Sequence, residues 1–214
     1  MHRLVRLFAI VLLAALLFGC AKKATVPPLP KPEGTLAVSG FTSPKFTWEL
    51  LAGYLPEEGK GVDADVLTAL NESMLQVLGS HGVDDFIAPS VTRQCREIVV
   101  FEQGRQRVSA FEYWLGVGQC IPADYLLVPQ VLYWRDRTPD SLGYKQPSSV
   151  VIDLYLIHVP EKRIVRRFHF DETQQPLSEN LLEAQKFFDR KGRWVSALEL
   201  AREGLEEGLT ELGL

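Results

Sequence analysis

ADYLLVPQVLYWR, residues 123–135, is the strongest strand signal in the chain. Apolar and aromatic residues fill the stretch, and its centre, residues 126–128, reads as a segment buried inside a sheet. Pro129 follows this centre, and because proline has no N–H to donate, the strand must either bulge there or have a free edge. The stretch therefore predicts a central strand.

Further strand signals lie on both sides of this segment. Residues 150–159 (VVIDLYLIHV) alternate between two faces, and residues 164–170 return after a turn at 160–163. With residues 123–135 they predict an antiparallel meander. Upstream, residues 35–41 (TLAVSGF) and 85–89 (DFIAP) read as two short strands.

Helical spacing of apolar residues marks four other segments. They are residues 63–80, with Asp63 as N-cap and Gly82 as C-cap, then 109–119, 180–188 and 194–212. Residues 95–101 are compatible with either a helix or a strand, and residues 102–107 read as a charged loop. The order β-α-β-α-β-β-β-α-α predicts an α+β fold in which helices pack on a mixed sheet.

The N-terminus has the form of a lipoprotein leader. Arg3 and Arg6 precede an apolar run at 7–18, which is shorter than the roughly 20 residues of a spanning helix. The run ends in Leu-Phe-Gly-Cys, residues 17–20, which resembles the bacterial lipobox, so we expect cleavage before Cys20 and a lipid (palmitate among its acyl chains) on its sulfur. The alternatives are an ordinary secretory signal with a chance cysteine, or an uncleaved membrane anchor.

Residues 20–34 form a tether between the expected lipid and a globular domain at 35–214. Four prolines in this stretch favour an extended, semi-rigid chain. About 14 residues at roughly 3.1 Å each would reach on the order of 40 Å from the bilayer. Ala21, where an aspartate would favour retention, points to the periplasmic side of the outer membrane, with the inner membrane as the alternative.

Composition excludes some functions and leaves one pairing open. The net charge is −4, and removing residues 1–19 deletes Arg3 and Arg6 but no acid, which makes it −6. A mildly acidic chain is a poor candidate for binding nucleic acid. In an exported protein Cys95 and Cys120 can form a disulfide, the alternative being two buried free thiols.

The chain resembles the periplasmic lipoproteins that share the fold of the TolB N-terminal domain. This group includes the outer-membrane activator of penicillin-binding proteins and the curli secretion lipoprotein. The resemblance covers about residues 35–170 and is carried by LAVSGF (36–41), the helix from Asp63, DFIAP (85–89) and ADYLLVPQVLYW (123–134). DETQQPLSENLL and RKGRWVSALELA are also similar to stretches of uncharacterised lipoproteins, a likeness that implies no activity.

Catalytic motifs are missing from the sequence. It contains no G-x-S-x-G elbow, no phosphate-binding glycine loop and no Cys/His cluster with metal spacing, so we expect no cofactor and no metal. His158 and His169 lie on neighbouring predicted strands and could approach each other to bind a metal, but no carboxylate at ligand spacing joins them, which favours sheet packing or a solvent-facing pair. The polar residues at 171–175 could form a site at the sheet edge or simply cap a helix.

Aromatic residues provide the better lead, since such residues in loops are enriched at protein interfaces. The candidates, for which burial on the sheet is the alternative, are Phe46, Trp48, Tyr54, Tyr133 and Trp134. The sequence thus predicts a lipid-anchored, non-enzymatic periplasmic protein that binds or regulates another protein complex of the cell envelope. The alternatives are an envelope enzyme of hydrolase type and a lipoprotein that binds a small ligand in a deep apolar pocket.

Overall fold

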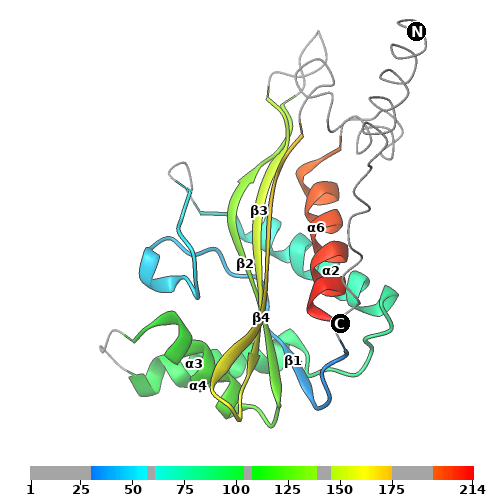
Figure 1. Ribbon diagram of the computed structural model, residues 1–214. Coiled ribbons are helices and arrows are strands. Elements are labelled where there is room, and N and C mark those ends of the chain that lie inside the picture. Colours follow the sequence, from blue (N-terminus) through cyan, green and yellow to red (C-terminus); the bar gives the residue numbers. More distant parts are fainter. Residues whose placement is uncertain (1–29, 57–60, 104–107, 139–145, 175–194) are drawn as a thin grey trace, which may run out of the picture.

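The computed structural model describes residues 30–56, 61–103, 108–138, 146–174 and 195–214. Its four strands form one sheet in the order β1-β2-β3-β4, which stands edge-on in Figure 1. The bounds are β1 (Leu36–Val38), β2 (Tyr125–Arg135), β3 (Ser149–His158) and β4 (Arg163–Thr173). Strand β1 runs parallel to β2, and β2, β3 and β4 form the predicted antiparallel meander.

Pro129 is accommodated because the strand beside it is short. β1 ends at Val38, so no residue of β1 lies opposite Pro129, whose carbonyl accepts the N–H of Thr42 over 3.2 Å. On the other side Pro129 pairs with Leu154 of β3. The bulge of β2 lies further along, between Val131 and Tyr133.

Helices α2 (Ala64–Ser80) and α6 (Ala197–Leu212) cover one face of the sheet (Figure 1). They bury one apolar stripe each against the even-numbered side chains of β3, which include Leu154 and Leu156, and this is the main core. Asp63 is the N-cap of α2 but makes no side-chain cap bond, and Gly82 has the predicted positive φ of 71° just past its C-terminus.

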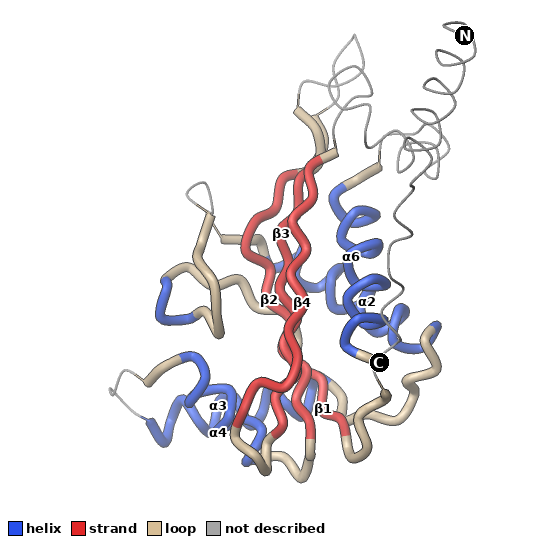
Figure 2. Tube along the Cα trace, in the orientation of Figure 1, coloured by secondary structure: helices blue, strands red, loops and turns tan. Residues whose placement is uncertain are grey.

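Helices α3 (Pro89–Gln103) and α4 (Ala110–Cys120) cover the lower part of the opposite face (Figures 1 and 2). Their second core joins Trp114 and Val117 to odd-numbered residues of β3 such as Ile157. Ser109 and Glu112 form a capping box at the start of α4, in which the backbone N–H of Ser109 lowers the pKa of the Glu112 carboxyl. The fold class is confirmed as α+β, since the described helices pack on a four-stranded mixed sheet.

Two sequence expectations need correction or completion. Residues 85–89 are no strand, since only Ile87 bridges Ala37 and Pro89 already begins α3, where a proline at the first helical position loses no hydrogen bond. Residues 91–103 are helical, because Thr92, Cys95 and Val99 then share one buried face. The helix expected at 180–188, Cys20 and the leader lie outside the described residues. Within the described ranges, no helix is both long enough and apolar enough to span a membrane.

Candidate functional site

Residues 41–56 form a loop, here called the aromatic loop. It lies on the same face of the sheet as α3 and α4, against the part of that face that these helices leave uncovered, and it projects from the sheet (Figure 1). Phe41 and Leu50 are buried, and Leu50 packs on Leu132 and Val151 in a small apolar cluster. Between them the short helix η1 (Thr47–Glu49) forms the outer turn. The loop is therefore attached by buried apolar side chains, while its outer part lies in solvent.

Three large aromatic side chains of this loop are exposed. Phe46 is 55 % exposed, Trp48 51 % and Tyr54 76 %. The rings of Phe46 and Trp48 stack on each other, with centroids 5.4 Å apart and planes 8° from parallel. The Glu49 carboxylate accepts the N–H groups of Lys45 and Phe46 over 2.6 and 3.3 Å and so closes the turn that carries the pair.

Side chains of the sheet bind the backbone of the aromatic loop from below. Gln130 is 1 % exposed, and its amide donates to the Glu49 carbonyl over 3.0 Å and accepts the Leu51 N–H over 3.4 Å. The Tyr155 hydroxyl lies 2.9 Å from the Ala52 carbonyl. Backbone groups of Glu49, Leu51 and Ala52 are thus hydrogen-bonded to two buried side chains, one from β2 and one from β3.

A buried carboxylate, Asp153, lies beside these contacts. It has no exposed side-chain surface, and three donors surround it: Tyr155 at 2.7 Å, Arg167 at 3.1 and 3.2 Å, and His169 Nδ1 at 2.7 Å. A charge removed from water in this way is tolerated only with such partners. Its register opposite both Gln130 and His169 makes Asp153 the centre of the polar row across the sheet.

The environment of this row determines which groups carry protons. Burial, together with the hydrogen bond to Asp153, raises the pKa of the Tyr155 hydroxyl well above its usual value, so Tyr155 keeps its proton. Burial opposes the charge on Arg167, but Asp153 and Tyr155 together outweigh this effect and raise the pKa of Arg167. Arg167 also lies over the Tyr155 ring, with its guanidinium carbon 5.4 Å from the centroid.

The structure separates the five predicted aromatic residues into two groups. Phe46, Trp48 and Tyr54 are exposed in the aromatic loop. Tyr133 is half-buried next to the small cluster beneath that loop and is contacted by Arg135, whose guanidinium donates to its hydroxyl over 3.1 Å. Trp134 is half-buried against the main core on the opposite face. The candidate surface therefore consists of the first three residues, with Tyr133 at its base.

The two strand histidines do not meet. His169 pairs with Asp153 in mid-strand, whereas His158 pairs with Arg163 at the far end of β3 and contacts Glu161 and the Tyr125 ring. The antiparallel register places them five residues apart along β3, which corrects the expectation that they could approach each other. Across the residues that the structure describes, no three potential metal-ligating side chains of His, Cys, Asp or Glu cluster together.

The polar cluster predicted after β4 is also dispersed. Asp171 is exposed on β4, while Gln174 is buried and accepts the Val195 N–H over 3.0 Å, which ties the end of β4 to the start of the last helical segment. Residue 175 lies outside the described ranges. Of the described members of this cluster, Gln174 therefore serves the packing of the fold, whereas Asp171 faces solvent.

Cys95 and Cys120 are joined in the structure, with their sulfur atoms 2.09 Å apart and their Cα atoms 5.8 Å apart. The bond connects α3 to the last residue of α4. Both helices belong to the second core, so the link lies on the same side of the sheet as the aromatic loop.

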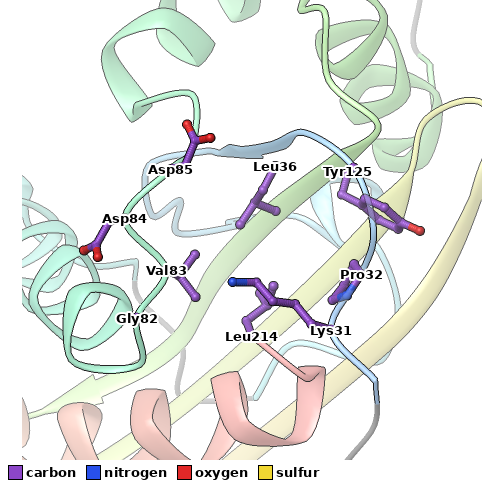
Figure 3. A pocket seen from close by; sticks show the side chains of 10 residues that line it. Lys31, Pro32, Leu36, Gly82, Val83, Asp84, Asp85, Tyr125 and Leu214 are labelled. Carbon is purple, nitrogen blue, oxygen red and sulfur yellow. The ribbon is translucent and has the colours of Figure 1, made fainter.

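A small pocket of about 230 Å³ lies where β1 and β2 meet the turn after α2 (Figure 3). The end of the tether, the turn after α2 and the C-terminus form its walls, and Lys31, Pro32, Val83, Tyr125 and Leu214 are among the lining residues. Binding sites for drug-sized ligands measure roughly 300–1,000 Å³. This pocket is smaller than the deep apolar site that a small-ligand-binding lipoprotein would need.

Sequence reasoning missed the cluster formed by Gln130, Asp153 and Tyr155. The one available signal was Asp153 itself, a lone carboxylate within the otherwise apolar segment 150–157. A charge in such a strand requires partners on the neighbouring strands. Which residues supply them depends on the register, and this is not visible in the sequence.

Neither a protein family model nor a curated protein matches the chain. The solved structures with a distant likeness include the following three. The PelC dodecamer of Paraburkholderia phytofirmans shares 14 % identity over 87 % of this chain and 91 % of its own, with a TM-score of 0.45. The LpoB C-terminal domain of Salmonella enterica shares 15 % identity over 67 % of this chain and 85 % of its own, with a TM-score of 0.36. The lipoprotein GNA1162 of Neisseria meningitidis shares 11 % identity over 74 % of this chain and 97 % of its own, with a TM-score of 0.39. Our proposals on function rest on the residues of this chain.

Proposed function

We propose that this protein is a lipid-anchored accessory protein of the bacterial cell envelope that binds another envelope protein through the aromatic loop. The observation that carries the proposal is the exposed Phe46–Trp48 stack on a backbone held from below by Gln130 and Tyr155. Large aromatic side chains that remain in solvent on a firmly held loop are typical anchors of protein interfaces.

The form of the surface favours a protein as the occupant. The aromatic loop projects from the sheet (Figure 1), and a projecting surface suits insertion into a hollow of a partner better than the enclosure of a small molecule. A preformed loop also loses little conformational entropy on binding, so more of the energy of ring burial appears as affinity.

The direction of the tether is consistent with this role. Arg166 donates to the carbonyl of Pro30 over 2.9 Å and also to the carbonyl of Leu212 at the end of α6. The tether therefore joins the domain on the α6 face of the sheet, and the aromatic loop lies on the opposite face (Figure 1). If Cys20 carries the lipid, the attachment leaves the aromatic loop uncovered by the tether residues that the structure describes.

The proposal is tested by site-specific photo-crosslinking in intact cells. A photoreactive residue at position 46 should yield one discrete protein adduct, and the same residue at position 75 should not, because Leu75 is a 38 % exposed apolar residue on α2. The captured protein is then purified and its affinity for the wild-type chain and for Trp48→Ala is measured. Loss of a central aromatic anchor should weaken binding about tenfold or more.

Two results would contradict the proposal. One is an adduct pattern that is identical for positions 46 and 75. The other is equal affinity of Trp48→Ala and wild type for the captured protein. Adducts with lipid alone at position 46 would assign the aromatic loop to the membrane surface instead.

A further inference from the structure

Tyr155 has one hydroxyl proton and two acceptors. The Asp153 carboxylate lies 2.7 Å from the Tyr155 oxygen, and the Ala52 carbonyl of the aromatic loop lies 2.9 Å from it. A tyrosine hydroxyl can donate only one hydrogen. Because its raised pKa keeps Tyr155 protonated, this one hydrogen is always present and is shared between the sheet and the loop.

The other donors to Asp153 influence how this hydrogen is shared. Arg167 and His169 both lie within hydrogen-bond distance of the carboxylate. Each donor that Asp153 already accepts from reduces the negative charge that attracts the Tyr155 hydrogen. The hydrogen is then more available to Ala52, so the sheet cluster and the loop are coupled through one atom.

Gln130 forms the second attachment and is independent of that hydrogen. Its amide group donates to Glu49 and accepts from Leu51, so it binds the residues on both sides of Leu50. The Leu51 N–H therefore reports directly on whether the loop is seated on the sheet.

We propose that Gln130 and Tyr155 are positioning residues that keep the aromatic loop preformed, and that Asp153 sets how firmly Tyr155 holds the loop. The role of the seated loop in partner binding rests on the function proposed above, whereas the seating itself does not. Gln130 and Tyr155 are too buried to contact a partner directly, so both act through the loop.

Hydrogen–deuterium exchange of the full-length lipoprotein in detergent tests the seating without any partner. In Tyr155→Phe the ring remains and only the hydroxyl is lost, so amides at 49–53 should exchange about three- to tenfold faster, the range for one net hydrogen bond. Gln130→Met should release the Leu51 amide in the same way. Tyr125→Phe, a matched change in a residue that packs against the main core on the opposite face of the sheet, should leave these amides unchanged.

Asp153→Asn tests the shared hydrogen. A neutral amide oxygen is a weaker acceptor than a carboxylate, so the Tyr155 hydrogen should move toward Ala52. Exchange at 51–53 should then be at least as slow as in the wild type, even though β3 and β4 lose protection. Faster exchange in the loop and the sheet together would overturn the shared-hydrogen part of the proposal.

The outcomes separate the two proposals. Unchanged loop exchange in both Tyr155→Phe and Gln130→Met would overturn the positioning role, whatever the partner experiments show. Faster loop exchange with weaker binding of the captured partner would support both proposals. Faster loop exchange combined with an unaffected Trp48→Ala complex would support the positioning role and contradict the function proposed for the loop.

Discussion

At the scale of single residues, the bond between Cys95 and Cys120 is the covalent link between two helices of the second core. The residues are 25 positions apart in sequence and join α3 to α4. In the chain-entropy model a closed loop of this length stabilises the folded state by about 3 kcal/mol. We propose that the mature protein carries this bond in the oxidising periplasm.

Replacing both residues by serine should therefore lower the free energy of unfolding by about 3 kcal/mol. Urea unfolding of the double variant and of the wild type measures this difference, and the wild type with added reductant should behave like the variant. A thiol assay on the denatured, unreduced mature protein should find neither cysteine reactive. Two reactive thiols would exclude the bond.

At the scale of elements, α6 depends on glycine for its distance from the sheet. A Cβ added at Gly208 would lie 2.5 Å from a Phe168 ring carbon and 2.6 Å from Leu154, and one added at Gly204 would lie 2.7 Å from Phe170. These separations are far inside van der Waals contact, so the helix can lie this close only because both positions lack a side chain.

Gly208→Ala should therefore destabilise the protein by about 1–3 kcal/mol, because overpacking outweighs the roughly 1 kcal/mol that alanine gains in helix propensity. Gly79→Ala in α2 is the matched control. Its new Cβ would meet nothing nearer than 3.7 Å, so this change should stabilise the protein by about 0.5–1 kcal/mol. Thermal or urea unfolding shows whether the two variants move in opposite directions. Equal stabilisation by both would contradict the close contact of α6 with β3 and β4.

At the scale of the whole molecule, the described end of the tether and the aromatic loop lie on opposite faces of the sheet. Arg166 holds Pro30 at the end of α6, while Gln130 and Tyr155 hold the aromatic loop on the other face of the sheet. A lipid on Cys20, which lies outside the described residues, would be connected to the domain on its α6 side.

Cys20→Ala should release the protein from the membrane fraction, because each buried CH₂ of an acyl chain contributes roughly 0.8 kcal/mol to membrane affinity. Cell fractionation with immunoblotting measures the change, and Cys95→Ser serves as a control that removes a different cysteine. Retention of Cys20→Ala in membranes washed with high salt would show that something other than this lipid attaches the chain.

Much of the fold follows from local patterns. Alternation and apolar runs predict β2, β3 and β4 as a meander, and helical spacing predicts α2, α4 and α6, because these periodicities reflect the backbone geometry of each segment alone. α3 was undecided and residues 85–89 were wrongly predicted as a strand. In both places short mixed segments take their conformation from the surfaces on which they pack.

The candidate site was predicted only in part. Phe46, Trp48 and Trp134 are all large aromatic residues, and nothing in their local sequence shows which of them is exposed. Only the structure shows that the first two are exposed and that the third packs against the main core. Likewise, Asp153 is visible as an unusual charge, but its partners are set by cross-strand register.

By itself, the sequence determined the β2–β3–β4 meander, the helices α2, α4 and α6, the α+β class and a lipid-anchor signal, since each depends on residues close together in the chain. Only the tertiary structure decided that Gln130 and Tyr155 hold the aromatic loop, that His158 and His169 stay apart, and that the tether and the aromatic loop lie on opposite faces. The physical reason is that register and packing join residues about 80 to 100 positions apart, as in the contacts of Gln130 with Glu49 and of Tyr155 with Ala52.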